Sequence, residues 1–376
     1  MTTSSVTDTG KPVSLLGFGI MRMPKKNAVT QRIDRKTAAE MIDFAIANGV
    51  NYFDTAYIYH LGDSESFIGE ALKKYPRESF NLATKLPTWL VKSERDVEKF
   101  FNRQLEKCQT DYFDFYLVHS LNNDNRKKID KYNIYEILSR KKAEGKIKNL
   151  GFSFHDKPPV LKEIACGYDW DFAQIQLNYL DWELQDARTQ YQILRDRGIH
   201  VIVMEPVRGG TLATLNPKSA AILKEAAPDK SLASWAIRYA ASLPGVLTVL
   251  SGMSNLEQVK DNLNTMSPLI PFSEAEYKTV TNALAAYKKS AVIPCTACRY
   301  CMPCPMGVDI PGVFAAYNLF CTGGNKFSFS GDYDLLGNEH KAAQCVNCGK
   351  CTSHCPQSIK IPDWLGKINT FANSEE

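Results

Sequence analysis

Eight short apolar runs lie between residue 15 and about residue 262, and longer amphipathic stretches alternate with them. Most of these runs are almost continuously hydrophobic, which is typical of parallel strands covered on both faces. The predicted strands are Leu15–Ile20, Val50–Asp54, Phe80–Lys85, Phe113–His119, Ile147–Ser153, Phe172–Leu177, Ile199–Met204 and Val246–Ser251. Eight strands with intervening helices over about 250 residues favour an α/β fold of the (β/α)₈ TIM barrel type.

The amphipathic stretches have helical spacing and recognisable ends. Three predicted helices stop at a glycine, which commonly follows a helix: Arg35–Asn48, Ile134–Glu144 and Gln185–Arg197. Ser93 and Asp96 resemble a capping box ahead of a helix over Val97–Gln109. A doubly wound sheet is the competing fold, but Gly17-Phe18-Gly19 lacks the third glycine and the following helix of a dinucleotide-binding loop.

Composition and charge narrow the class of protein. The chain has 376 residues, enough for one large barrel and a small appendage. Its net charge of +4 is mild and the basic residues are dispersed, which gives no case for nucleic acid or for a membrane surface as partner. Met1–Gly10 is polar, and no apolar stretch approaches the length of a bilayer span. We therefore expect a cytoplasmic protein.

The cysteines divide the chain into two parts. Only Cys108 and Cys166 fall within the first 294 residues, and the other nine of the eleven cysteines lie between 295 and 355. This split predicts two domains, a barrel over 1–285 and a cysteine-rich domain over 286–376. Ser273 and Glu276 form a second candidate capping box, which would open a connecting helix that runs to about Ser290.

The spacing of eight cysteines indicates a metal centre. The first run has three two-residue gaps and ends in Cys-Pro, and the second run ends with a three-residue gap before Cys-Pro. The two sets are Cys295, Cys298, Cys301 and Cys304, then Cys345, Cys348, Cys351 and Cys355. A zinc site is the alternative, since two C-x-x-C pairs can make a tetrahedral site, but the repeated run followed by Cys-Pro favours iron–sulfur clusters.

Over residues 291–362 the second part resembles bacterial-type two-cluster ferredoxins. The resemblance implies two [4Fe–4S] clusters, in which the last cysteine of each run closes the cluster of the other run. Cys355 would join the first three cysteines of the first run, and Cys304 would join the first three of the second run. A segment from about Ala315 to Lys341 separates the two halves.

Polar side chains stand where consecutive strands of the predicted barrel end, which is where such barrels carry their reacting groups. Asp54 and Tyr59 follow the second strand, Lys85 ends the third and His119 ends the fourth. A phenol with its ordinary pKa of about 10 releases its proton reluctantly at neutral pH, and an adjacent ammonium eases that release. Asp54 could hold Lys85 in place, and His119 could bond the oxygen of a bound carbonyl compound. Each of the four has a purely structural interpretation, and only the set as a whole is persuasive.

Around these positions, from about residue 14 to 265, the chain resembles the aldo-keto reductase family. The matching segments are Phe53–Tyr59, Gly62–Leu72, Thr84-Lys85 and Leu117–His119. The resemblance implies that Tyr59 donates a proton, that Lys85 and Asp54 tune it, and that His119 orients the substrate. It further implies an NAD(P)H cofactor whose carboxamide is held by Ser153 and Gln174, with Asn178 nearby. The other implied cofactor contacts are Gly19, Ile20, Met21, Met204, Pro206, Gly252, Gln258 and Asn262.

The sequence departs from that family pattern at three places. Met204 stands where an aromatic residue usually stacks on the nicotinamide, and Phe154 replaces the usual Asn. Gly252 and Gln258 stand where NADP-specific members carry basic residues, so the choice between NAD and NADP is open. Met21, Trp89 and the loop Ser120–Asn125 are expected to line a pocket for a small carbonyl or alcohol substrate.

Three interpretations of the whole chain follow. The first is a nicotinamide-dependent reductase or alcohol dehydrogenase that also carries clusters. The second is an iron–sulfur electron-transfer protein whose barrel no longer performs hydride chemistry. The third is a barrel braced by purely structural clusters. Clusters move single electrons and nicotinamide moves a hydride, so a flavin, a redox partner such as a ferredoxin or flavoprotein, or a substrate radical would have to mediate between them.

Overall fold

The computed structural model of the protein describes residues 2–4, 11–26, 32–288, 292–321 and 326–374. The chain folds into two compact units. The first comprises Met1–Pro206 and Ser234–Phe272, and the second comprises Val207–Ala233 and Ser273–Glu376. The segment after the seventh barrel strand thus belongs with the C-terminal residues, while the domain boundary expected between residues 285 and 286 stays a prediction.

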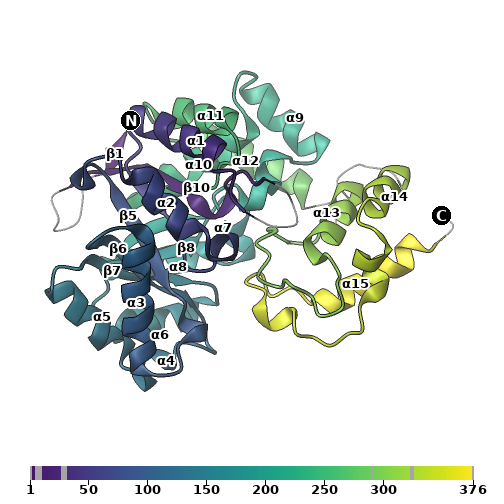
Figure 1. The fold of residues 1–376 in the computed structure, drawn as a ribbon. Coiled ribbons are helices and arrows are strands. Elements are labelled where there is room, and N and C mark those ends of the chain that lie inside the picture. The colour runs from purple at the N-terminus through teal and green to yellow at the C-terminus, as the bar shows by residue number, and fades with distance from the viewer. Residues whose placement is uncertain (1, 5–10, 27–31, 289–291, 322–325, 375–376) are drawn as a thin grey trace. The chain divides into compact units, whose positions relative to one another are not determined.

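The first unit is a closed barrel of eight parallel strands in the order β10-β3-β4-β5-β6-β7-β8-β9. Figure 1 labels β5, β6, β7, β8 and β10 of this barrel. All eight predicted strands are present, so the predicted TIM barrel is confirmed. The strands are β3 (Leu16–Gly19), β4 (Tyr52–Asp54), β5 (Asn81–Leu86), β6 (Phe113–Leu121), β7 (Ile147–Phe154), β8 (Phe172–Gln176), β9 (His200–Met204) and β10 (Val246–Ser251). A short antiparallel pair, β1 (Thr3–Ser4) and β2 (Val13–Ser14), precedes them.

The barrel is filled by apolar side chains. Tyr52, Phe115 and Phe172 form edge-on aromatic pairs inside it, and Leu247 from β10 packs with them. Because successive side chains of a strand point to opposite faces, the same strands also present apolar residues to the surrounding helices. This explains why their sequences are almost continuously hydrophobic.

Helices follow the strands along the chain. They are α1 (Arg35–Ala47), α2 (Ser64–Leu72), α3 (Glu94–Cys108), α4 (Lys128–Lys131), α5 (Ile134–Ala143), α6 (Pro158–Gly167), α7 (Asp181–Leu184), α8 (Ala187–Asp196), α10 (Leu232–Ala241) and α11 (Leu256–Met266). The glycines that follow α1 and α5 have φ of 87° and 76°, the left-handed conformation expected after a helix. The helix predicted over Gln185–Arg197 begins later, since Asp186 has φ 52° and separates α8 from the short α7.

The first candidate capping box is not formed as predicted. Ser93 precedes α3, but its side chain caps no backbone N–H, and the helix begins at Glu94 rather than Val97. The carboxylate of Asp96 instead accepts hydrogen bonds from the Lys92 N–H at 2.9 Å and from the Ser93 hydroxyl at 3.1 Å. Because the Asp96 carboxylate accepts a hydrogen bond from the Ser93 hydroxyl, Ser93 acts as a donor here and not as the acceptor that a capping box requires.

The second unit contains α9 (Pro217–Ala226), α12 (Glu274–Tyr287), α13 (Ile310–Cys321), α14 (Lys326–Asp334) and α15 (Ile361–Ala372). The capping box of Ser273 and Glu276 is complete, as predicted; Ser290, where the helix was expected to end, lies outside the described residues. The core of this unit is formed by Val308, Val313, Phe314, Leu365 and Ile368, among others. Among the described residues no helix is both long and apolar enough to cross a membrane.

Candidate functional site

Four polar side chains meet at the carboxyl ends of the barrel strands. Asp54 is the last residue of β4, Lys85 lies near the end of β5, and His119 lies in the last part of β6. Tyr59 opens the short 3₁₀ helix η2 (Tyr59–Gly62) that follows β4. All four are buried, with exposed fractions of 8% or less.

Lys85 is fixed from two sides. Its Nζ donates to Oδ1 of Asp54 at 2.6 Å and to the backbone carbonyl of Thr55 at 2.7 Å. Because β4 and β5 are adjacent and parallel, with Asp54 paired to Ala83, the lysine reaches the carboxylate across one strand spacing. The second carboxylate oxygen of Asp54, Oδ2, is buried and has no hydrogen-bond partner among the described residues.

The phenol and the imidazole lie beside this ion pair. The ammonium of Lys85 is 5.0 Å from the centroid of the Tyr59 ring. The rings of Tyr59 and His119 are edge-on with centroids 6.2 Å apart, and the Trp89 ring is tilted against His119 with centroids 5.1 Å apart. The predicted set is therefore brought together, and Trp89 is a neighbour of it.

Burial governs the electrostatics of the set. It raises the pKa of Asp54 and lowers the pKa of Lys85, while the ion pair opposes both shifts. Burial also holds the pKa of His119 well below 6.5, and nearby Lys85 and His155 lower it further. His119 is therefore a neutral imidazole near pH 7, which can exchange hydrogen bonds but carries no spare proton.

The backbone is strained around this end of the barrel. His60 and Leu61 after β4, Ser120 in β6 and Glu205 after β9 have φ between 52° and 56°, although none is glycine. Non-glycine residues held in this region cost free energy and concentrate at functional sites. The strain lies directly next to Tyr59, His119 and Met204, three of the predicted site residues.

Ser153 and Gln174 lie side by side as register partners on β7 and β8. The Oγ atom of Ser153 accepts a hydrogen bond from the Ser120 N–H at 2.7 Å, so its own hydroxyl proton is directed elsewhere. The amide nitrogen of Gln174 donates to the sulfur of Met204 at 3.5 Å, and its Oε1 is buried without a partner among the described residues. One donor and one acceptor on neighbouring strands match the oxygen and the NH₂ group of a carboxamide.

Asn178 is engaged within the protein. Its amide nitrogen donates to Asp181 and to the backbone carbonyl of Glu205, and its Oδ1 accepts from the N–H groups of Leu180 and Asp181. The side chain therefore ties the loop after β8 to the loop after β9, the loop that also contains Pro206.

The remaining predicted cofactor contacts lie around the ends of β3 and β10. Gly19 ends β3, and Ile20 and Met21 form the turn after it. A Cβ at Gly19 would lie 3.4 Å from the carbonyl of Ser251, and one at Gly252 would lie 3.0 Å from the Arg22 side chain. Asn262 donates to the hydroxyl of Ser251 at 2.8 Å.

Gln258 lies in the first turn of α11 and is exposed. Its Oε1 accepts a hydrogen bond from the Ser254 N–H at 2.7 Å, and its own backbone N–H is capped by Asn255. No positive charge is supplied by this residue, and its neighbour Glu257 is acidic.

Two supporting groups were not identified from the sequence. Gln104 on α3 donates to the carbonyl of Lys85 at 3.0 Å and to the buried carboxylate of Glu65 at 2.5 Å. Lys128 donates to three backbone carbonyls of one loop, those of Thr88, Trp89 and Val91, at 3.0–3.2 Å. Site residues in the barrel were predicted from their position at the ends of predicted strands, and neither Gln104 nor Lys128 lies at such a position.

The cysteines of the second unit gather into two groups. Burial raises the pKa of Cys301, and the neighbouring Cys298, Cys295 and Cys355 raise it further. Burial likewise raises the pKa of Cys351, whose cysteine neighbours are Cys345 and Cys304. Each group thus draws its distant member from the other run of the sequence. Cys348 is exposed.

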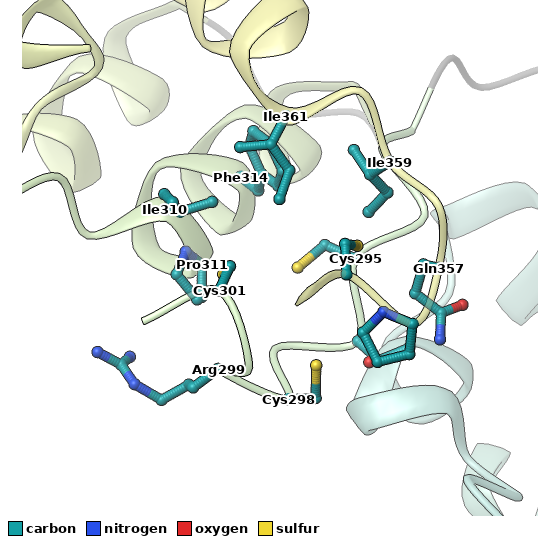
Figure 2. A pocket seen from close by; sticks show the side chains of 13 residues that line it. Cys295, Cys298, Arg299, Cys301, Ile310, Pro311, Phe314, Gln357, Ile359 and Ile361 are labelled. Atoms are coloured by element: carbon teal, nitrogen blue, oxygen red, sulfur yellow. The ribbon is translucent and has the colours of Figure 1, made fainter. Parts of the chain in front are cut away.

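The first group lines a cavity of about 320 Å³, a volume that includes space open to solvent. Figure 2 shows Cys295, Cys298 and Cys301 along one loop, with Gln357 and Ile359 coming from the segment after Cys355. Ile310, Phe314 and Ile361 close the apolar side. Among the described residues no three His, Cys, Asp or Glu side chains converge closely enough to hold a single metal ion, and the cysteines surround a space instead.

Comparisons with known proteins agree with this division. A family model described as "Aldo/keto reductase family" matches residues 15–285, and one described as "4Fe-4S dicluster domain" matches residues 294–361. The chain is 26% identical over 286 residues to L-galactose dehydrogenase of Arabidopsis thaliana, covering 70% of this chain and 87% of that protein. It is 26% identical over 222 residues to an NADH-specific methylglyoxal reductase of Escherichia coli, covering 53% and 65%.

Among solved structures, the aldo-keto reductase AKR11C1 from Bacillus halodurans in its holo form is similar, with a TM-score of 0.63 and 27% sequence identity. The similarity covers 75% of this chain and 96% of that chain.

Proposed function

Since the chain belongs to the aldo/keto reductase family, we propose that its barrel reduces an aldehyde or ketone with a reduced nicotinamide cofactor, or runs the reverse oxidation of an alcohol. The observation that carries the proposal is the buried ion pair of Lys85 and Asp54 at 2.6 Å, with Tyr59 and His119 beside it. A phenol, an ammonium and a neutral imidazole at one point suit a reaction in which a carbonyl oxygen gains a proton.

Tyr59 is the proton donor in this proposal. As negative charge develops on the carbonyl oxygen, the phenol transfers its proton to that oxygen, and the resulting phenolate is stabilised by the Lys85 ammonium. Asp54 keeps that ammonium charged and in place despite its burial. A reduced nicotinamide, when bound, would supply the hydride for the carbonyl carbon, so one hydride and one proton would convert the carbonyl to an alcohol.

His119 has a different role because it is neutral. A proton held by an imidazolium could compete with the phenol, but burial and Lys85 keep His119 unprotonated near pH 7. Its N–H therefore donates a hydrogen bond to the substrate oxygen and directs that oxygen toward Tyr59. Trp89, packed on the imidazole, supplies an apolar wall for the substrate.

Ser153 and Gln174 would hold the cofactor. The Ser153 hydroxyl, whose Oγ already accepts from the Ser120 N–H, would donate to the carboxamide oxygen, and the unpartnered Oε1 of Gln174 would accept from the carboxamide NH₂. Met204, whose sulfur accepts a hydrogen bond from Gln174, would pack against the nicotinamide ring in place of an aromatic residue. We assign Asn178 to positioning the loop at Glu205, because its amide already makes its hydrogen bonds within the protein.

The C-terminal unit would bind two [4Fe–4S] clusters, one per cysteine group, and exchange single electrons with a redox partner. The match to a 4Fe-4S dicluster domain over residues 294–361 supports this part of the proposal. A single-electron carrier cannot take a hydride directly, so a flavin or a partner protein would connect the two chemistries.

The proposal is tested by NAD(P)H consumption with a panel of simple aldehydes and ketones under anaerobic conditions. We expect steady turnover by the wild-type protein and a loss of at least about 100-fold with Tyr59→Phe, the contribution typical of a positioned proton donor. Tyr57→Phe is the matched control, because that phenol lies over Lys107 and not over Lys85. Equal turnover by wild type and Tyr59→Phe would refute the proposed role.

A second candidate function is electron transfer without hydride chemistry. Met204 and Phe154, which depart from the family pattern beside the nicotinamide site, favour it. In that case dithionite would bleach the clusters, while no carbonyl compound in the panel would cause NAD(P)H consumption.

A further inference from the structure

Arg208 is the largest fully buried side chain of the described residues, with 1% exposed. It lies in the 3₁₀ helix η5 (Arg208–Ala213), a segment that belongs to the same compact unit as the cysteines. Its backbone has φ 50°, a conformation that a non-glycine residue adopts at a cost. Burying a guanidinium is also costly. A strained residue with a buried charge calls for a functional explanation.

Arg208 touches the segment that closes the first cysteine group. Its Nη2 donates to Oε1 of Gln357 at 3.2 Å. Gln357 follows Cys355 by two residues, is 8% exposed and lines the cavity together with Cys295, Cys298 and Cys301 (Figure 2). The guanidinium therefore lies one side chain away from the space that the four cysteines surround.

The next residue fixes the same segment against the other side of the group. A Cβ on Gly209 would lie 2.2 Å from the carbonyl oxygen of Thr296, which means that only glycine allows this approach. Thr296 is 2% exposed and stands between Cys295 and Cys298 in the chain. Arg208 and Gly209 thus contact the loops on both sides of one cysteine group.

We propose that the Arg208 guanidinium, acting through the Gln357 amide, raises the reduction potential of the cluster held by Cys295, Cys298, Cys301 and Cys355. This inference rests on the proposed presence of clusters in the C-terminal unit. A cluster bound by four thiolates is anionic and gains one more negative charge when it takes up an electron. A buried positive charge nearby stabilises the reduced form, and its effect is large because little water screens it.

Arg208 thereby makes the first cluster a better electron acceptor than it would be without this charge. Arg208 is a positioning and charge-supplying residue, since Gln357 stands between it and the cavity. This role concerns the first cluster. Arg208 contacts Gln357 and Gly209 contacts Thr296, and both contacted residues line the cavity of the first cysteine group.

The test is an anaerobic redox titration of the full-length protein followed by electron paramagnetic resonance of the reduced clusters. Arg208→Gln should shift one cluster to a lower potential and leave the other unchanged, at unaltered iron and sulfide content. Lys367→Gln removes the same charge from the exposed face of α15 and should change neither potential. Combining Arg208→Gln with Cys348→Ser, which removes a ligand of the other set, identifies the cluster that shifts.

Unchanged potentials in Arg208→Gln with both clusters present would overturn the inference. If that variant fails to assemble its clusters, Arg208→Lys decides the question: one potential should equal the wild-type value at neutral pH and fall at alkaline pH, as the ammonium loses its proton. A pH-independent potential in Arg208→Lys would count against the inference. Wild-type protein that takes up no iron or sulfide would instead refute the proposed clusters themselves.

Discussion

The Nζ atom of Lys85 and the Oδ1 atom of Asp54 are 2.6 Å apart, and the two side chains have exposed fractions of 0% and 4%. Two opposite charges at this depth stabilise each other only as a pair, since each alone would be an uncompensated buried charge. The pair therefore controls both the stability of the barrel and the charge beside Tyr59.

Comparison of Asp54→Asn with the double variant Asp54→Asn/Lys85→Met should separate these two effects. Leaving the Lys85 charge without its partner should lower the free energy of unfolding by about 3–5 kcal/mol, and reductase activity should fall with it. The double variant Asp54→Asn/Lys85→Met removes both charges and should regain most of that stability while staying inactive. Urea unfolding and NAD(P)H consumption measure the two quantities. A double variant no more stable than Asp54→Asn would contradict the ion-pair interpretation.

The low pKa of His119 predicts a loss of stability in acid. A histidine whose pKa is lower in the folded state contributes stability above its unfolded pKa of about 6.5, and that contribution is lost as the pH falls below this value. His119→Gln, which cannot be protonated, should flatten the dependence of the melting temperature on pH below about 6.5. Equal slopes in wild type and His119→Gln would show that the imidazole is not held neutral.

The surroundings of Gln258 predict weak discrimination between the two nicotinamide cofactors. A 2′-phosphate gains affinity from charge-assisted partners, and Gln258 offers none. We expect the dissociation constants of NADH and NADPH to lie within about tenfold of each other. Gln258→Arg should tighten the binding of NADPH by about tenfold and have little effect on the binding of NADH. Gln258→Glu, which adds a negative charge in place of the positive one, should weaken the binding of NADPH and leave that of NADH unchanged. Fluorescence titrations with both cofactors measure these affinities, and wild-type protein that binds NADPH far more tightly than NADH would contradict the expectation.

The strands and the site residues at their ends were predictable for a common physical reason. Parallel strands buried on both faces are hydrophobic throughout, so a polar residue such as Asp54, Lys85 or His119 at the end of a run marks the point where the strand leaves the core. Closure of the barrel then places the carboxyl ends of these strands at one face, which brings the polar residues together. The capping box at Ser273 was predictable for a similarly local reason, because its partners are three residues apart.

Contacts between distant segments could not be predicted in the same way. Arg208 and Gln357 are 149 positions apart, and neither belongs to a periodic pattern. The three acceptors of Lys128 are backbone carbonyls, which every residue carries and no sequence pattern marks. The helix start predicted at Val97 was wrong: Ser93 and Asp96 have the spacing of a capping box, but the Ser93 hydroxyl donates to the Asp96 carboxylate and caps no backbone N–H.

Lys128 is expected to matter for substrate binding more than for chemistry. Its ammonium ties down the loop of residues 88–91, and this loop holds Trp89 against His119. Lys128→Met should release Trp89, raise KM by about 3- to 10-fold and change kcat little, since uniform binding is lost. Lys127→Met, at the exposed neighbouring position, should leave both constants unchanged. A fall in kcat at constant KM would argue instead for a role in the proton transfer.

The last cysteine of each run lies with cysteines of the other run, and this arrangement gives a prediction about iron content. Cys355 lies with Cys295, Cys298 and Cys301, whereas Cys304, only three residues after Cys301, lies with Cys345 and Cys351. Cys355→Ser combined with Cys301→Ser should therefore impair the same cluster as either change alone and leave roughly half of the iron bound. Cys304→Ser combined with Cys301→Ser should impair both clusters and leave almost none, although these two positions are closer in the chain. Cys321→Ser, outside both groups, should keep the full iron content.

Iron and sulfide assays on anaerobically purified protein distinguish the pairs, and a greater loss in the Cys301/Cys355 pair than in the Cys301/Cys304 pair would show that each run holds its own cluster.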